Sequence, residues 1–227
     1  MSIALGIIFA LLLVILFIAF SSAYIRSGVF VKTFSRIPTN EKILALTFDD
    51  GPHPEITPLI LDILKKYNIQ AVFFCIGDNI EKNKKLTNRI VNEGHLIGNH
   101  TNRHNYNFPF FSSRRMKMEI DASWDRIVST DFPNPPRLFR PPFGITNPSL
   151  RRALKNSGYT VVGWNIRSLD TVIKDPVVVV RRVTQKIKPG SIILLHDSTF
   201  YEPEILERVI IFAQKKGYTF VRIDKYL

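Results

Sequence analysis

The sequence contains little cysteine and little histidine. Cys75 is the only cysteine in 227 residues, so no disulfide can form within the chain. It lies in the apolar stretch 71–76, which is typical of a buried strand, and we therefore expect a structural thiol and not a nucleophile. Histidine occurs only five times, and two of the five, His100 and His104, stand four residues apart. A rare residue at this spacing is the first indication of a site.

Internal repeats, low-complexity tracts and recognisable nucleic-acid-binding motifs are absent from the sequence. The formal net charge is +12, yet the lysines form no long block. Lys82, Lys84 and Lys85 are interleaved with Asn and with apolar helix positions, as on ordinary solvated helix faces. The composition therefore predicts no nucleic-acid partner, and no feature of it indicates an obligate protein partner.

Charged residues and proline are also absent from residues 3–20, which form a continuous apolar run. This length suffices to cross a bilayer as a helix, and a terminal run that is apolar on every face argues against a buried core helix. The length of the run and the lack of a basic region before it favour a membrane anchor. The small residues Ser21, Ser22 and Ala23 leave a cleaved signal peptide open as the alternative.

The orientation of this segment is ambiguous. Four basic residues follow it, namely Arg26, Lys32, Arg36 and Lys42. The positive-inside rule alone would leave the rest of the chain in the cytoplasm. We expect three segments: a membrane anchor or signal segment at 1–23, a polar and basic connector at 24–41, and one globular domain at 42–227.

From Lys42 onward, short apolar runs rich in β-branched residues alternate with longer amphipathic stretches. Seven strands are expected, at residues 43–48, 71–76, 95–98, 137–140, 159–164, 192–196 and 218–223. Such alternation predicts an α/β fold with a mostly parallel sheet and helical crossovers. About seven strands favour a closed or nearly closed barrel over a doubly wound sheet, and in barrels reactive residues gather where the strands end at one rim.

Two adjacent carboxylates, Asp49 and Asp50, follow the first of these strands. Neighbouring carboxylates repel each other, so they need a cation or hydrogen-bond donors nearby. A simple turn is the alternative, because the Asp-Gly-Pro sequence at 50–52 is favourable turn chemistry. Because neighbouring side chains on a strand point in opposite directions, one carboxylate could bind a metal ion while the other faces a bound water as a base.

The histidine pair suits a metal site. If the segment from His100 to His104 turns helically, the two imidazoles share one face. Together with one carboxylate they leave coordination positions open for water and substrate, as a hydrolytic metal site requires. His95 belongs to the preceding strand and is expected to be structural, whereas His53 has no assigned role.

Two later strand ends carry further candidates. Arg140 precedes a double proline, which stiffens the loop and would present the arginine as a partner for Asp49. His196 ends an apolar strand, where a core histidine is the alternative. Asp170 could fix the tautomer of His196 and raise its pKa, so that the imidazolium could donate a proton to a leaving group.

Taken in this order, the motifs resemble those of the polysaccharide deacetylase family with the NodB homology domain (carbohydrate esterase family 4). The resemblance covers about residues 42–227. It rests on T-F-D-D-G at 47–51, H-T-x-x-H at 100–104, R-P-P-F-G at 140–144, a Trp-to-Asp segment at 164–170 and L-x-H at 194–196. It implies a distorted (β/α) barrel of about seven strands that removes acetyl groups from a polysaccharide.

The resemblance also implies the residues of a metal and base site. Asp50, His100 and His104 would be the metal ligands, and Asp49 would be the general base, paired with and tuned by Arg140. The cofactor would be one divalent metal ion. Zinc is expected, while two histidines and one carboxylate also suit cobalt, manganese, nickel or iron(II).

On the leaving-group side, the resemblance implies that His196 is the general acid and that Asp170 orients it. Trp164 and Leu194 would line the acetyl pocket. In the mechanism that we expect, the backbone N–H of Phe143 would help to hold the tetrahedral oxyanion.

The fourth motif departs from the family pattern. Many members carry Asp-x-x-Asp-Trp, with an arginine just before the second Asp. Here Arg167 replaces the first Asp, Leu169 replaces the arginine and Thr171 replaces the Trp, while Asp170 is retained. Arg167 could substitute for the missing arginine. The departure concerns substrate contacts more than the metal site.

We therefore expect a metal-dependent enzyme that removes N-acetyl groups from an N-acetylglucosamine-containing polysaccharide, such as peptidoglycan or an exopolysaccharide. An O-acetyl polysaccharide esterase, a hydrolase of small-molecule amides and a non-catalytic, membrane-attached glycan-binding protein are the alternatives. Such polysaccharides lie outside the cytoplasm, so we expect an extracytoplasmic domain held by the N-terminal helix, or secreted if the segment is cleaved. The basic flank of the helix argues the opposite.

Overall fold

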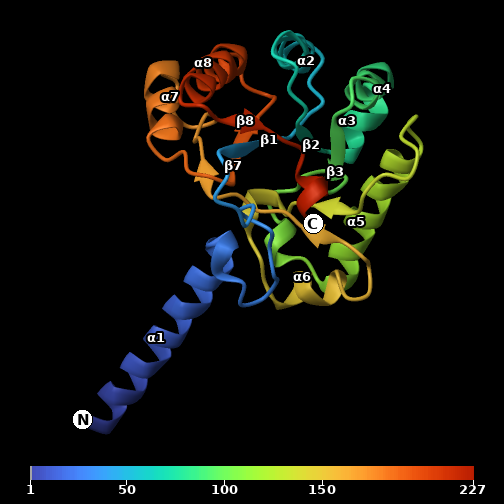
Figure 1. Cartoon of the computed structure of the whole chain (residues 1–227). Coiled ribbons are helices and arrows are strands. Elements are labelled where there is room, and N and C mark those ends of the chain that lie inside the picture. The colour runs from blue at the N-terminus through green and yellow to red at the C-terminus, as the bar shows by residue number, and fades with distance from the viewer. Residues whose placement is uncertain (1) are drawn as a thin grey trace.

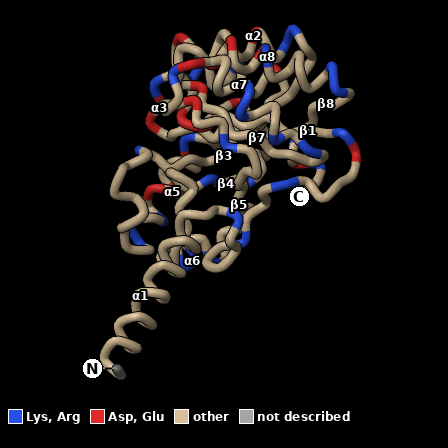
Figure 2. Tube along the Cα trace, turned by 90° about the vertical axis from the view of Figure 1, so that its left-hand side faces the viewer, with Lys and Arg blue, Asp and Glu red and all other residues tan. Residues whose placement is uncertain are grey.

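The computed structural model describes residues 2–227 and shows a long N-terminal helix that projects from a rounded α/β domain (Figure 1). The helix is α1, Ser2–Ala23. The side chains from Ile3 to Phe20 are exposed, and by length and composition the helix could cross a membrane. Figure 2 shows no Lys, Arg, Asp or Glu on α1, whereas charged residues of both signs are spread over the domain.

Within residues 2–227, eight strands form one curled sheet in the order β5-β4-β3-β2-β1-β7-β6, with β8 paired to β1 beside this path. All of these strand pairs are parallel. The strands are β1 (Ile43–Asp49), β2 (Val72–Cys75), β3 (Leu96–Asn99), β4 (Leu138–Phe139), β5 (Thr160–Val161), β6 (Ile166–Arg167), β7 (Ser191–His196) and β8 (Thr219–Phe220). The predicted parallel, barrel-like α/β fold is confirmed. Strand β6 was not predicted, because a two-residue strand leaves no apolar run in the sequence.

Helices surround the curled sheet (Figure 1). The α-helices of the domain are α2 (Ile56–Lys66), α3 (Gly77–Lys82), α4 (Lys84–Asn92), α5 (Ser113–Val128), α6 (Pro148–Ala153), α7 (Pro176–Thr184) and α8 (Glu202–Lys215). Short 3-10 helices are η1 (Ile25–Ser27), η2 (Phe108–Phe110), η3 (Pro142–Gly144) and η4 (Ile223–Tyr226). Several helices begin at side-chain caps; Asp175, for example, accepts from the N–H groups of Val177 and Val178 ahead of Pro176.

The polar connector contributes backbone pairing to the barrel. Phe34 forms a parallel bridge with Val162 after β5, and Arg36 forms an antiparallel bridge with Ser191 of β7. Strands β5 and β6 are the two ends of the described strand order. The connector pairs with the chain next to β5 and with β7, so it spans the gap between the two ends of the curled sheet. The Arg36 guanidinium also donates two hydrogen bonds to the Pro189 carbonyl, at 3.1 and 2.9 Å.

The central strand β1 is buried at all seven positions, and its alternate side chains enter two different apolar clusters. Leu44, Leu46 and Phe48 pack with residues of α2, α7 and α8, whereas Ile43 and Ala45 pack with residues of the neighbouring strands. Strands covered on both faces bury every position, which explains the continuous apolar run. The interior is filled mainly by apolar side chains, and the charged or ionisable side chains of β1 and β7, Asp49 and His196, stand at the carboxyl ends of these strands.

Candidate active site

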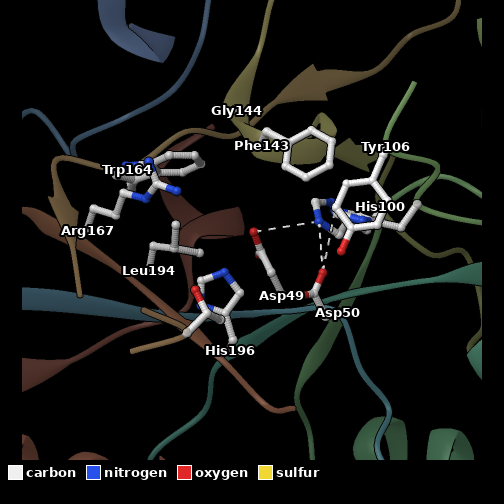
Figure 3. A pocket seen from close by; sticks show the side chains of 12 residues that line it. Asp49, Asp50, His100, Tyr106, Phe143, Gly144, Trp164, Arg167, Leu194 and His196 are labelled. Carbon is white, nitrogen blue, oxygen red and sulfur yellow. Dashed lines mark ion pairs between the residues drawn. The ribbon is translucent and has the colours of Figure 1, made fainter. Parts of the chain in front are cut away.

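One pocket lies at the rim where the carboxyl ends of the central strands meet (Figure 3). It is lined by Asp49, Asp50, His100, His104, Tyr106, Phe143, Gly144, Trp164, Arg167, Thr171, Leu194 and His196. Eight of the ten site residues expected from the sequence are in this lining. The other two, Arg140 and Asp170, lie behind it in contact with Asp49 and His196.

Both adjacent carboxylates enter this same pocket. Asp49 is the last residue of β1, and Asp50 leaves the strand with a left-handed backbone, φ 79°. This change of conformation cancels the alternation that would have sent the two side chains to opposite faces. The Asn79 amide donates to the Asp50 carbonyl at 2.8 Å and helps to hold the turn. The expectation of opposite orientations was therefore wrong, and both carboxylates are available to one site.

The histidine segment is a loop and not a helical turn. Thr101 and His104 have left-handed backbones, with φ 66° and 47°. The Asn99 side chain accepts from the Thr101 N–H at 2.9 Å, and the Thr101 hydroxyl accepts from the His104 N–H at 3.1 Å. The two imidazole rings nevertheless converge, with centroids 4.8 Å apart. The ligand spacing thus arises from a hydrogen-bonded loop.

Asp50, His100 and His104 place one potential ligand atom each within 4.8 Å of one another. The Asp50 Oδ1 atom lies 3.5 Å from Nε2 of His100 and 3.6 Å from Nε2 of His104. His100 Nδ1 donates to the Arg140 carbonyl at 2.7 Å, which fixes the tautomer and leaves Nε2 with a lone pair facing the carboxylate. Asp50 Oδ1 is buried and accepts no hydrogen bond from residues 2–227.

The charge states in this cluster also suit a cation. Burial opposes ionisation of Asp50, but the positive charge that His100 carries when it is protonated holds the pKa of Asp50 below its usual range. Burial and the neighbouring His100 ring lower the pKa of His104 to about 4, so this ring is neutral at physiological pH. Burial opposes a charge on His100, but Asp49 and Asp50 raise its pKa, so a metal ion bound here would replace the proton on Nε2. A carboxylate with an unpartnered oxygen, the neutral His104 ring and the deprotonated Nε2 of His100 fit a divalent metal ion.

Arg140 holds Asp49 from behind the pocket. Its side chain is fully buried, and its Nη1 atom donates to Oδ1 of Asp49 at 2.6 Å and to the Thr47 hydroxyl at 2.9 Å. Its remaining donors reach the carbonyls of Val162 and Gly163, both at 3.0 Å. The second oxygen of Asp49, Oδ2, lies 3.8 Å from Nε2 of His100. Asp49 is thus an oriented carboxylate with one oxygen toward the cluster of Asp50, His100 and His104.

His196 and Asp170 form the opposite wall. Asp170 Oδ1 accepts from Nδ1 of His196 at 2.7 Å, and Oδ2 accepts from the His196 backbone N–H, also at 2.7 Å. The Ser168 hydroxyl donates to Oδ1 at 2.7 Å. Burial opposes the charged ring, but the Asp170 carboxylate raises the pKa of His196 to about 9. With Nδ1 engaged, the Nε2 nitrogen is the one available to the pocket.

Aromatic and apolar side chains close the remaining side of the pocket. Phe143 packs edge-on against His104 with centroids 4.9 Å apart, and its left-handed backbone, φ 61°, lies inside η3. Gly144 also has a left-handed backbone, φ 71°, and a Cβ atom there would lie 2.4 Å from Trp164. The glycine of the R-P-P-F-G motif therefore permits the close approach of Trp164, while Leu194 lies beside them in the lining.

Arg167 lines the pocket but does not pair with Asp170. Among the described ion pairs, Asp170 is joined only to His196, and the Arg167 guanidinium instead lies 6.0 Å from the centroid of the Trp164 ring. The idea that Arg167 replaces the missing arginine as a partner of Asp170 is therefore not supported. A cationic side chain faces the pocket where the family pattern has a carboxylate.

Sequence reasoning missed Tyr106. Its ring is 85% exposed and lies parallel to Phe143, with centroids 5.8 Å apart and planes 20° apart. The only local signal was an aromatic residue soon after His104 in an Asn-rich loop. His53 and His95 lie outside the pocket: His53 Nδ1 accepts from the backbone N–H of Glu55 at 3.3 Å, and His95 Nδ1 accepts from that of Ala71 at 3.1 Å.

The chain is similar to several known proteins. Residues 36–162 match the family model described as polysaccharide deacetylase. A peptidoglycan-N-acetylglucosamine deacetylase of Bacillus cereus is 36% identical over 196 residues, which span 84% of this chain and 91% of that protein. A peptidoglycan-N-acetylmuramic acid deacetylase of Bacillus subtilis is 31% identical over 189 residues, which span 82% of this chain and 72% of that protein.

Solved structures share the fold. The crystal structure of a peptidoglycan N-acetylglucosamine deacetylase matches with a TM-score of 0.78 and 31% identity, over 85% of this chain and 91% of that one. A Bacillus anthracis protein described as a pseudoenzyme of carbohydrate esterase family 4 matches with a TM-score of 0.78 and 28% identity, over 86% of this chain and 68% of that one. The fold alone therefore does not separate active from inactive relatives, and the pocket residues must carry that distinction.

Proposed function

The chain belongs to the polysaccharide deacetylase family, and on that premise we propose that it is a metal-dependent hydrolase that removes N-acetyl groups from N-acetylglucosamine units of peptidoglycan. The observation that carries the proposal is the placement of two oriented pairs in one pocket. Asp49 is held by Arg140, and His196 is held by Asp170. Both Asp49 and His196 line the pocket that also contains the cluster of proposed metal ligands. These are the parts that amide hydrolysis requires: a base, an acid and a site for a Lewis acid.

Asp50, His100 and His104 would hold the metal ion, for which zinc is the first candidate and cobalt, manganese, nickel and iron(II) are the alternatives. A cation held there supplies Lewis-acid activation of the acetyl carbonyl and of water. The Arg140 carbonyl keeps the ring of His100 in the tautomer that ligation needs. Elemental analysis of the purified protein identifies the metal.

Asp49 acts as the general base. Its Oδ1 atom is held by Arg140, and Oδ2 accepts the proton of the attacking water as the new C–O bond forms at the acetyl carbon. The backbone N–H of Phe143 holds the developing oxyanion. The Arg140 guanidinium, buried with its donors on four oxygen acceptors, keeps the base fixed throughout.

His196 acts as the general acid. Its Nε2 proton passes to the sugar nitrogen as the C–N bond breaks, so acetate and a free amine leave the pocket. Asp170 stabilises the protonated ring and prevents it from turning. Trp164 and Leu194 pack around the acetyl methyl group. Water therefore adds across the amide bond without any other reactant.

Acetate release from N-acetylglucosamine oligomers tests the proposal, with acetylxylan as the O-acetyl comparison and chelated protein as the metal control. We expect release from the N-acetylated oligomers by native protein only. Asp49→Asn should lose about 10²–10⁴-fold in kcat while its metal content persists, because it removes the base and no ligand. Asp121→Asn, on the exposed face of α5, is the matched control. Activity of Asp49→Asn equal to that of the native protein would exclude this role for Asp49.

The same assay decides between the proposal and its alternatives. Release from acetylxylan alone indicates an O-acetyl esterase. Binding of glycan without release from any substrate, in protein that contains metal, indicates a non-catalytic glycan-binding protein. The pseudoenzyme among the similar structures shows that members without activity exist. Oligomers of N-acetylmuramic acid and N-acetylglucosamine units, tested in parallel, identify the sugar that is acted on.

For localisation, we propose that α1 is a retained membrane anchor and that the domain faces outward. The end of α1 is docked on the domain: Ser21 is buried, and the Thr146 N–H donates to the Ser22 carbonyl at 3.0 Å. A cleavage site at 21–23 would be covered by these contacts. Two of the four basic residues after α1 serve the fold, because Arg36 and Lys42 donate to backbone carbonyls, and this weakens the argument from the positive-inside rule.

Protease treatment of intact cells and of spheroplasts tests this orientation. We expect full-length protein in the membrane fraction and digestion of the domain from the outside. A soluble, shortened protein in the medium would indicate signal cleavage. A domain protected in spheroplasts would place it in the cytoplasm.

A further inference from the structure

A fully buried carboxyl group lies behind the proposed acid, at Glu202, the first residue of α8. Neither of its side-chain oxygens meets a conventional hydrogen-bond donor in the described part of the chain. An ionised carboxylate without donors is very unfavourable in such surroundings, because desolvation penalises the charge and nothing offsets it. The group must therefore bear a proton or share one with a neighbour.

The neighbour is Asp170, whose carboxylate is close enough to the Glu202 side chain for the two to share a hydrogen bond if one of them carries a proton. Two ionised carboxylates cannot form such a bond, because both would be acceptors, so one of them carries the proton. Asp170 already accepts from the Ser168 hydroxyl and from both Nδ1 and the backbone N–H of His196. These donors stabilise the ionised form of Asp170, and the proton belongs on Glu202.

Electrostatics support this assignment. Burial, followed by the charge of Asp170, raises the pKa of Glu202 well above its usual range. In contrast, hydrogen bonds from His196, Glu202 and Ser168 outweigh burial and lower the pKa of Asp170. The charge of a second buried carboxyl group, Asp197, adds a smaller contribution that raises the pKa of Glu202 further.

We propose that Glu202 is a neutral carboxylic acid that donates a hydrogen bond to Asp170 and thereby acts as a positioning residue for the Asp170–His196 pair. Its significance for catalysis rests on the function proposed above, whereas the hydrogen bond itself does not. The Glu202 hydrogen bond helps to fix the Asp170 carboxylate and withdraws part of its negative charge. His196 is then held less basic than Asp170 alone would make it, and it releases its proton more readily.

Three charged groups affect the pKa of His196, and the pH profile of kcat depends on all of them. Asp170 precedes α7, and Asp49 and Asp50 lie at the end of β1. Glu202 acts on His196 only through Asp170. A substitution that removes the hydrogen bond from Glu202 to Asp170 therefore changes the pKa of His196. The contacts of Asp49 and of the proposed metal ligands stay as they are.

The protonation of Glu202 can be tested directly by infrared difference spectroscopy of the full chain in detergent, comparing native protein with Glu202→Gln at neutral pH. We expect the carbonyl-stretch band of a protonated carboxylic acid in the native protein and its loss in the variant. Glu204→Gln is the matched control, since Glu204 lies in the same helical turn but forms an exposed ion pair with Arg208 at 2.8 Å. A native spectrum in which Glu202 contributes only carboxylate bands would overturn the proposal.

Kinetics test the positioning role. Glu202→Gln keeps a donor toward Asp170 and should retain the native pH profile of kcat. Glu202→Leu removes the donor, and we expect a loss of about tenfold in kcat with KM little changed. We also expect the alkaline limb to shift upward by about half a pH unit. A purely structural role would lower stability in both variants without moving this limb.

These outcomes separate the two proposals. If native protein releases no acetate but shows the acid band, the deacetylase proposal fails and the buried hydrogen bond stands. If acetate is released but Glu202→Gln and Glu202→Leu share one pH profile, the positioning role is wrong. Should Glu202→Leu fail to fold, the infrared comparison and the profile of Glu202→Gln still decide.

Discussion

At the scale of single residues, Arg140 carries a charge that is completely removed from solvent. Its guanidinium is fully buried, and its charge is balanced by Asp49 at 2.6 Å. A buried ion pair contributes modest net stability when complete, because desolvation offsets the attraction. Removing one partner is costly, since the other charge then stays buried alone. The pair therefore holds Asp49, the proposed base, in one orientation, and breaking the pair should cost much stability.

We expect Arg140→Met to lower the free energy of unfolding by about 3–5 kcal/mol, because it leaves Asp49 and the Thr47 hydroxyl without their donor. Arg126→Met is the matched control: Arg126 forms an exposed pair with Glu81, and its loss should cost less than about 1 kcal/mol. Denaturant unfolding of both variants measures the difference. Equal midpoints would show that the buried pair does not have this role.

The pH dependence of activity should follow His196. Burial opposes its charge, but Asp170 raises its pKa to about 9, above the value of about 6.5 in the unfolded chain. Because the acid must be protonated, kcat should fall as pH rises through about 9. The stability contributed by the pair is fully present below about 6.5 and is lost as pH rises through about 9.

The substitution Asp170→Asn tests whether the Asp170–His196 pair causes the fall of kcat at alkaline pH. Removal of the carboxylate charge should move the alkaline limb of kcat downward, toward about 6.5. The profile is measured as kcat against pH at saturating substrate, with native protein in parallel. An unmoved limb in the variant would show that the limb belongs to another group.

At the scale of elements, the loop between β3 and α5 brings Tyr106 to the open side of the pocket. Its exposed ring stacks on Phe143, which in turn packs on His104. An exposed aromatic surface at a pocket rim offers an apolar face and a hydroxyl to a sugar ring. Such contacts bind ground state and transition state equally.

We therefore expect Tyr106→Ala to raise KM for oligosaccharides severalfold with kcat nearly unchanged. Phe110→Ala is the control, because Phe110 is 87% exposed in the same loop but does not line the pocket. Steady-state kinetics on oligomers of increasing length measure the effect. A loss confined to kcat would contradict a binding role for this ring.

At the scale of the whole molecule, residues from several strand ends and loops meet at one rim, so metal binding should stabilise the entire domain. Ligands that bind only the folded state raise stability by about 2.7 kcal/mol at 100 times their dissociation constant. Zinc added to chelated full-length protein should therefore raise the melting temperature. His104→Ala should lose most of this increment, whereas His53→Ala should keep it, because His53 lies outside the ligand cluster. An equal rise in both variants would place the metal elsewhere.

The apolar strands and the motifs could be predicted from the sequence alone. The runs at β1, β2 and β7 are buried over nearly their whole length, and such runs are encoded by consecutive residues. The candidate residues follow those runs, so their common rim could be inferred from the parallel topology. Strand β6, with two residues, and the pairing of Phe34 and Arg36 leave no periodic signal and could not be found this way.

Tertiary structure alone decided how the side chains are held. Arg140 reaches Asp49 across 91 positions of sequence, and His196 reaches Asp170 across 26. The two carboxylates share one pocket because Asp50 has a left-handed backbone, and the histidines converge through a loop. The sequence determined which groups stand at the ends of the strands, since burial and periodicity are local properties. Orientation, burial and protonation depend on contacts between distant segments, and these exist only in the folded chain.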